Sequence, residues 1–112
     1  MTNRKVAVAG PPIHPGEVLA DELAEIGATA SDAARAMGVP VNRISEILRC
    51  RRGMTADTAL RLGQWLGTDP NLWLDLQNDY DMRLAARSLG PTLKKIRRAK
   101  AAPRADKQVV IA

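Results

Sequence analysis

Apolar residues recur at helical spacing along most of the chain, and no segment shows the alternation of apolar and polar residues that is typical of a strand. The clearest pattern lies in residues 30–49, where two short apolar stripes are separated by Gly38 and Val39. The stripes consist of Ala33, Ala34 and Met37, followed by Ile44, Ile47 and Leu48. Gly38 can take the positive φ that a sharp turn between helices requires. We therefore predict two short helices joined by a tight turn.

Two helices of this length, joined so closely, are typical of a DNA-binding helix-turn-helix, in which the second helix lies in the major groove. Ala34 is small where the second helix must cross the first, and Val39 and Ile44 would fill the space between them. The polar residues of the second helix would face the other way, toward base edges. An ordinary helical hairpin inside a bundle would show the same apolar pattern, and this alternative stays open on the pattern alone.

The flanking segments predict three more helices and therefore an all-α fold. A first helix begins near Pro15, because proline is tolerated at an opening helical position, and Gly27 ends it. Its apolar stripe is Leu19, Leu23 and Ile26, with Val18 beside it. Ser31 is the expected cap of the next helix, the first of the pair.

A fourth helix is expected to begin at the cap Thr55 and to end at Gly67. Its inward residues are Ala59, Leu62 and Leu66. Asp69 and Pro70 give the cap-then-proline signal of a fifth helix. The apolar stripe of the fifth helix is Leu72, Trp73, Leu76 and Tyr80, of which we place Leu72 and Leu76 in the core. The Gly90-Pro91 pair is expected to break the chain, and residues 93–100 to form a short basic helix.

These elements divide the chain into a flexible arm at residues 1–13, a domain at 14–84 and a basic extension at 85–112 that is partly helical and then disordered. The core must be aliphatic, because the chain has no Phe, two Trp and one Tyr. Cys50 is the single cysteine, which excludes an intramolecular disulfide and indicates a reducing cytoplasm. One His and one Cys cannot form a structural zinc site, and we expect no cofactor. No apolar run has the length of a membrane span and the N-terminus lacks a signal-like apolar core, so we expect a soluble cytoplasmic protein.

Charge is distributed unevenly along the chain. Residues 1–81 carry 8 Lys/Arg against 11 Asp/Glu, a net charge of −3, whereas residues 82–112 carry 9 against one, a net charge of +8. Within the first part, residues 35–61 contain six Arg. Acidic stretches lie on both sides of this arginine-rich middle: Glu17, Asp21, Glu22 and Glu25 before it, and Asp69, Asp75, Asp79 and Asp81 after it. A polyanion would meet the arginine-rich middle, while the acidic stretches would face away or meet a basic partner.

The second helix of the pair opens with residue types that read base edges. Asn can bond adenine at two positions, Arg can fork onto guanine, a Val methyl can touch thymine, and Glu can accept from cytosine. The predicted base contacts are Val41, Asn42, Arg43 and Glu46, and Glu46 could alternatively orient Arg43. Phosphates require charge, hydroxyls or free amides but no sequence code. The predicted phosphate contacts are Ser45, Arg49, Arg51, Arg52 and Thr55, and each of these could instead be a solvated surface residue.

The segments that flank the pair make the pattern more specific. They are His14-Pro15-Gly16-Glu17, residues 53–62 (GMTADTALRL), Trp73-Leu74-Asp75-Leu76-Gln77 and Tyr80-Asp81. Together they resemble the HigA-type antitoxins, also called virulence-associated protein I, of the XRE or phage-repressor-like helix-turn-helix superfamily. The resemblance implies a five-helix, lambda repressor-like domain that dimerises, represses its own promoter and neutralises a HigB-type toxin, a ribosome-dependent ribonuclease of messenger RNA. It also implies a bacterial source and association with the nucleoid when the protein is bound to its operator.

Two positions depart from the family pattern. Pro40 stands where the family often has Ser or Thr at the start of the recognition helix, so a capping hydroxyl and one amide donor are missing. Cys50 stands in the following loop where the family often has Gly. Because a residue with a Cβ enters a left-handed turn less easily than glycine, we expect the geometry of this loop to differ.

A single domain of this kind reads half of a site, so paired half-sites require a homodimer. The expected dimer contacts are Trp73, Leu76 and Tyr80, with the core as the alternative place for Trp73. The residues expected to face a basic toxin are Glu17, Asp21, Glu22 and Glu25. The alternative function is that of a helix-turn-helix repressor without a toxin. We do not expect an enzyme: His14 has no paired nucleophile and is expected to start a helix, and Asp57 with Thr58 is typical of cap chemistry.

Overall fold

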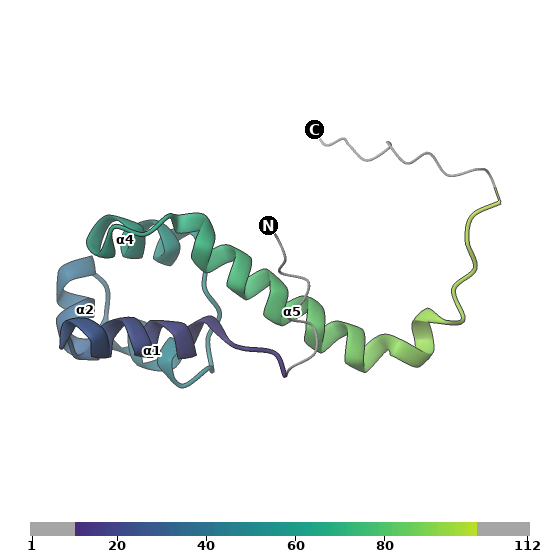
Figure 1. Cartoon of the computed structure of the whole chain (residues 1–112), viewed down its shortest axis with the longest axis horizontal. Helices are drawn as coiled ribbons and strands as arrows, with labels where there is room; N and C mark the ends of the chain where they lie inside the picture. The colour runs from purple at the N-terminus through teal and green to yellow at the C-terminus, as the bar shows by residue number, and fades with distance from the viewer. Residues whose placement is uncertain (1–10, 101–112) are drawn as a thin grey trace.

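The computed structural model describes residues 11–100, which form five helices and no strand. The helices are α1 (Pro15–Ile26), α2 (Ala30–Met37), α3 (Val41–Leu48), α4 (Ala56–Leu66) and α5 (Pro70–Leu93). Helices α1 to α4 and the beginning of α5 form one globule, and the rest of α5 extends away from it (Figure 1). The all-α, five-helix expectation is confirmed. The arm predicted at residues 1–13 falls mostly outside the described residues, and the disorder predicted for the last dozen residues falls wholly outside them.

A reciprocal cap at His14 opens α1, which confirms His14 as a helix-start residue. The backbone N–H of Gly16 donates to Nδ1 of His14 at 2.8 Å, and the N–H of His14 donates to the Glu17 carboxylate at 3.2 Å. These bonds satisfy donors that the first turn of a helix leaves open. Burial lowers the pKa of the His14 imidazole, against the opposing effect of the Glu17 and Asp81 charges. The lowered pKa favours the neutral imidazole, whose unprotonated Nδ1 accepts the hydrogen bond from Gly16.

Helix α2 is capped by Thr29, and the prediction that Ser31 caps it is wrong. The N–H of Asp32 donates to Oγ1 of Thr29 at 3.1 Å, and the N–H of Thr29 donates to the Asp32 carboxylate at 2.8 Å. With Thr29 as the cap, Ser31 is the second residue of α2. The acidic residue three positions after Thr29, which completes the capping box, is the signal in the sequence that identifies Thr29 as the cap.

The core lies where α1, α2, α3, α4 and the first turns of α5 meet. Its buried apolar residues are Leu19, Leu23, Ala33, Ala34, Met37, Ile44, Ile47, Met54, Ala59, Leu62 and Trp73. The prediction that Leu72 lies in the core is wrong, because this side chain is 42% exposed, and Ile26 of the predicted apolar stripe of α1 is 52% exposed. Ile26 is exposed because it is the last residue of α1. Leu72 is exposed because its neighbour Trp73 points into the core, and consecutive residues of a helix point about 100° apart. Trp73 is fully buried, and its Nε1 donates to Oγ1 of Thr68 at 2.9 Å.

The close approach of α1 to α3 depends on Gly16, in the first turn of α1. A Cβ at this position would overlap the backbone carbonyl oxygen of Ile47, near the end of α3. Glycine therefore allows the two backbones to touch, and the start of α1 fixes where the end of α3 lies.

Helix α5 continues through the predicted break at Gly90-Pro91 and ends at Leu93. Proline within a helix removes one hydrogen bond and crowds the preceding turn, but here the helix has to continue for just two residues beyond it. The predicted helix over residues 93–100 does not form, because irregular backbone follows α5. Leu93 and Ile96 are both exposed, so this segment has no apolar face packed against the globule.

Candidate nucleic-acid interface

The predicted tight turn between α2 and α3 is present. Gly38 has a φ of 71°, and the N–H of Val39 donates back to the Ala34 carbonyl at 3.0 Å. Pro40 caps α3 without a side-chain hydrogen bond, as its lack of a hydroxyl predicted. Both helices bury one face in the core, through Ala33, Ala34 and Met37 on α2 and through Ile44 and Ile47 on α3. The pair therefore has the geometry of a helix-turn-helix.

The outward face of α3 presents the predicted base-contact residues Val41 and Asn42, and both are exposed. Ser45 is half-buried, and its hydroxyl donates to the Val41 carbonyl at 3.0 Å. Arg49, which follows α3, is exposed. The accessible groups at the start of α3 are thus one branched apolar side chain and one amide, which suit a thymine methyl and an adenine edge.

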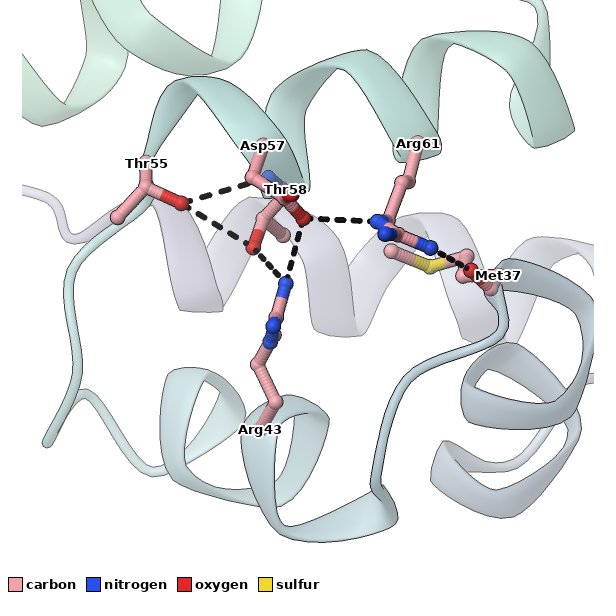
Figure 2. A network of polar contacts seen from close by, with 6 residues as sticks. All are labelled: Met37, Arg43, Thr55, Asp57, Thr58 and Arg61. Atoms are coloured by element: carbon pink, nitrogen blue, oxygen red, sulfur yellow. Dashed lines mark hydrogen bonds and ion pairs between the residues drawn. The ribbon is translucent and has the colours of Figure 1, made fainter.

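Arg43 points sideways from α3 toward α4 (Figure 2). Its Nη1 donates to Oδ1 of Asp57 at 2.7 Å and to Oγ1 of Thr58 at 3.4 Å. The Arg43 side chain is 27% exposed, less than that of Asp57 at 54%. The guanidinium predicted to fork onto guanine is therefore already bound within the molecule, and it would have to leave Asp57 to use that nitrogen on a base.

Asp57 joins two arginines, one from α3 and one from its own helix. Its Oδ1 also accepts from Nε of Arg61 at 2.7 Å, and Nη1 of Arg61 donates to the Met37 carbonyl at the end of α2 at 2.7 Å. Hydrogen bonds from Arg61 and then from Arg43 lower the pKa of the Asp57 carboxyl. Figure 2 shows the resulting chain of contacts from α3 through α4 to α2, which we call the arginine–aspartate network: Arg43, Asp57, Thr58, Arg61 and the Met37 carbonyl.

The sequence-based interpretation of Asp57 and Thr58 as cap chemistry was wrong in part. Thr55 is the cap, as predicted, because its Oγ1 accepts from the N–H of Thr58 at 3.3 Å. Asp57 instead connects helices. The spacing of Asp57 and Arg61, four residues apart on one helix, could have indicated an ion pair. Nothing in the local pattern indicated that Arg43, fourteen residues earlier, would join them.

Glu46 does not orient Arg43, which corrects that expectation. Its Oε1 accepts from Nε and Nη2 of Arg52, at 3.1 and 2.8 Å. Arg49 and Arg51 are exposed, and neither has an ion pair with any residue in the described range. Of the three arginines that directly follow α3, Arg49 and Arg51 are therefore the ones that a phosphate could engage without displacing a carboxylate.

A shallow hollow of about 240 Å³ lies between the start of α4 and the loop before it. It is lined by Arg43, Arg52, Gly53, Thr55, Asp57 and Thr58. Three of the predicted DNA-contact residues thus border one surface feature next to α3. Its two arginines are each balanced by a carboxylate, so the hollow is polar without being strongly cationic.

Cys50 adopts the left-handed conformation that we expected it to resist, with a φ of 62°. Its N–H donates to the Ile47 carbonyl at 2.9 Å, and the N–H of Arg51 donates to the Glu46 carbonyl at 2.8 Å. These bonds cap the last carbonyls of α3 in the way that a C-terminal glycine would. The cap outweighs the local strain, and the loop turns as it would around glycine.

The predicted toxin-facing residues all lie on α1. Asp21 and Glu25 are exposed, Glu22 is half-buried, and Glu17 is exposed while also taking part in the cap at His14. We call these four residues the acidic face of α1. It is an accessible negative surface on an element that contacts α3 and α5 through its other side.

The predicted dimer contacts on α5 differ in burial. Trp73 is fully buried in the core of one chain, so it has no surface with which to contact a second chain, and that prediction is wrong. Leu76 and Tyr80 are half-buried, and the Tyr80 ring meets His14 edge-on with centroids 4.8 Å apart. Further along α5, four apolar residues share one exposed face, which we call the α5 stripe: Met82, Ala86, Leu89 and Leu93.

Within residues 11–100, no cluster of three His, Cys, Asp or Glu side chains could hold a metal ion. No helix in this range is long and apolar enough to cross a membrane.

Comparison with known proteins identifies the family, although no family model matches the chain. The chain is 49% identical over 76 residues to virulence-associated protein I of Dichelobacter nodosus, covering 67% of this chain and 70% of that protein. It superimposes on the addiction module antidote protein of a HigA family from Coxiella burnetii with a TM-score of 0.75 and 41% identity, covering 85% of this chain and 100% of the other. It also matches the Pseudomonas aeruginosa antitoxin HigA with the higBA promoter, with a TM-score of 0.74 and 38% identity over 77% of this chain and 96% of the other. The chain belongs to the HigA family of helix-turn-helix antitoxins.

Proposed function

We propose that this protein is an antitoxin that binds the operator of its own promoter as a repressor and neutralises a HigB-type toxin. The observation that carries the proposal is the α2–α3 pair, with its tight turn at Gly38 and an α3 face left open to solvent at Val41 and Asn42. The Pseudomonas relative described with its promoter DNA supports the same role. As a member of a family of regulators, it would act in the bacterial cytoplasm, on the nucleoid when bound, and without catalysis of its own.

In the proposed complex α3 lies in the major groove. Val41 and Asn42 contact bases directly, whereas Arg43 and Glu46 reach a base only where they give up their present partners Asp57 and Arg52. The phosphates are contacted by Ser45, Arg49, Arg51, Arg52 and Thr55. Arg49 and Arg51 are available for this contact at once, because neither has an acidic partner within the described residues.

The repressor would act as a homodimer, because one helix-turn-helix reads half of a palindromic site. Leu76 and Tyr80 remain proposed dimer contacts. The α5 stripe adds an apolar surface that the single chain leaves exposed on a projecting helix, and a second copy of this helix is the partner that would cover it.

Substitution of Asn42 tests the DNA-binding proposal. We expect Asn42→Ala to weaken binding to the duplex upstream of this reading frame by about 1–3 kcal/mol and to relax the preference at one base pair, because an amide-to-adenine contact is lost. Asn78→Ala on α5 is the matched control, since Asn78 is also exposed and lies outside the pair. Competition binding against single-base variants of the duplex measures both effects. Unchanged affinity and preference in a Val41→Ala, Asn42→Ala double variant would contradict placement of α3 in the groove.

The acidic face of α1 is the proposed toxin-binding surface. We expect Asp21→Lys with Glu25→Lys to slow association with a basic toxin and to make the rate less dependent on salt, because long-range attraction is reversed. The core residues of α1 are untouched, so the fold should persist. The measurement is surface binding kinetics with a basic protein from a reading frame that adjoins this gene. A wild-type association rate would place the toxin elsewhere, and a gene with no such neighbour would favour a repressor without a toxin.

A further inference from the structure

The chain continues from α5 into a strongly cationic segment that the helix-turn-helix does not use. Five of the residues from 94 to 100 are basic: Lys94, Lys95, Arg97, Arg98 and Lys100. All seven residues of this segment are exposed, and none of the five basic side chains has a hydrogen bond or ion pair within the described range. There is no Asp or Glu between residues 82 and 100. We call residues 94–100 the basic segment.

The rest of the described chain has a net negative charge, which is unfavourable for binding a polyanion. Residues 11–93 carry eight Arg against eleven Asp and Glu, a net charge of −3. Five of these eight arginines are paired with a carboxylate of the same part of the chain: Arg35, Arg43, Arg52, Arg61 and Arg83. Arg49, Arg51 and Arg87 remain. Because affinity for the phosphate backbone comes largely from Lys and Arg that neutralise phosphates, the rest of the chain has few free cations for that task.

The basic segment reverses this balance. Residues 94–100 add five cations and no acid, which changes the net charge from −3 for residues 11–93 to +2 for residues 11–100. Helix α5, which precedes the segment, has 24 residues, a length of about 36 Å at 1.5 Å per residue. This length is close to one turn of B-DNA, about 34 Å. Helix α5 therefore holds the basic segment well away from α3, beyond the globule (Figure 1).

We propose that the basic segment is a second DNA-binding surface, which contacts the phosphate backbone outside the half-site read by α3. This inference rests on the proposed DNA-binding function, because the segment can meet a duplex beyond the half-site only when α3 holds the protein on that duplex. Its irregular backbone lets the cations follow a row of phosphates, and such contacts need no sequence code. An anionic lipid surface fits less well, because the segment lacks the ordered apolar face of an interfacial helix.

A charge-neutral variant tests the proposal on the full chain. The variant carries Lys94→Gln, Lys95→Gln, Arg97→Gln and Arg98→Gln, all at exposed positions outside the core. The matched control exchanges Lys for Arg and Arg for Lys at the same four positions and so keeps the charge. Two duplexes are used: the footprinted operator alone, and the same operator with about one helical turn of unrelated DNA added on each side.

On the long duplex we expect the slope of log K against log salt to fall by about 0.9 for each lost contact, hence by about three to four for each bound subunit. Between 50 and 200 mM salt, the wild type should therefore lose roughly a hundredfold more affinity for the long duplex than the neutral variant loses. The short duplex should bind the neutral variant and the wild type alike, which also shows that the variant folds. The charge-keeping control should match the wild type on both duplexes.

Three outcomes would overturn the proposal. The first is an identical salt slope for the neutral variant and the wild type on the long duplex. The second is an equal loss on both duplexes, which would place the contact inside the half-site. The third is an unchanged DNA slope together with lost binding to phosphatidylserine vesicles, which would assign the segment to membranes. Failure of the DNA-binding function itself would look different, because the wild type would then not distinguish its operator from a scrambled duplex.

Discussion

Cys50 holds a left-handed backbone, with a φ of 62°, in the loop between α3 and α4. For a residue with a Cβ this conformation costs roughly 1–2 kcal/mol, which glycine avoids, although glycine loses more freedom on folding. We therefore expect Cys50→Gly to raise the free energy of unfolding by about 1 kcal/mol. Urea denaturation measures the change, and Cys50→Ala serves as the control because it removes the thiol but keeps the Cβ. Equal stability of the Gly and Ala variants would show that the loop stores no strain.

Arg43 is the predicted base contact whose role the structure changes most. Because it is bound to Asp57 and Thr58, we expect Arg43→Ala and Asp57→Asn to act alike, each releasing α3 from α4. Each should weaken operator binding by roughly tenfold, and the double variant should be little weaker than either single one. A double-mutant cycle of operator affinities tests this coupling.

The base preference of the two variants separates the two roles of Arg43. If Arg43 positions α3, both variants should keep the preference of the wild type at each base pair. Relaxed preference at one base pair in Arg43→Ala, with none in Asp57→Asn, would return Arg43 to the list of residues that read bases.

At the scale of elements, the start of α1 depends on the protonation state of its cap. The folded state holds His14 neutral, and burial lowers its pKa, so the unfolded chain binds the proton more readily. The contribution of His14 to the free energy of unfolding is fully present at a pH above the unfolded-state pKa of about 6.5. This contribution is lost as the pH falls from that value through the lower pKa of the folded state. Denaturation midpoints should therefore decrease on acidification in this window. His14→Asn keeps a capping acceptor without a titrating group, and an identical pH profile for this variant would contradict the assignment.

Much of the element order could be predicted because its signals are local. The opening Pro15, the turn glycine Gly38 and the Asp69-Pro70 start each act within one turn of helix, and all three lie where the pattern placed them. The errors arose where contacts between residues far apart in the sequence determine which side chains are buried. Apolar spacing gives the inward face of a helix but not how far a neighbour covers it, which is why Leu72 was misplaced.

The same distinction applies to the candidate site. Exposed Val41 and Asn42 follow from the helical period of α3 alone. The partners of Arg43 and Arg52 depend on how α3 packs against α4 and its loop, and ion pairs across fourteen or six residues leave no periodic trace. The sequence therefore indicated which residues carry charge, while the fold decided which of those charges are already neutralised.

For the whole molecule, we expect a homodimer held by the α5 stripe on a palindromic site with half-site centres about 34–36 Å apart. Leu89→Asn should favour the monomer and weaken operator binding, because a polar group enters the apolar seam. Leu72→Asn is the matched control, since Leu89 and Leu72 are 44% and 42% exposed. Sedimentation at micromolar concentration measures the state of each variant. If Leu89→Asn remains a dimer, the α5 stripe is not the interface, and Leu76 and Tyr80 become the proposed contacts.

The contact at Gly16 has a consequence for how such a protein can diversify. Even a methyl group at this position would overlap the Ile47 carbonyl. The distance between α3 and α1 is therefore set by contact between their backbones and not by side chains. Val41 and Asn42, on the opposite side of the same helix, take no part in the buried core. Substitutions there can accumulate without a penalty in folding. After a gene duplication, a second copy of such a protein could thus come to bind a different operator while its core stays unchanged.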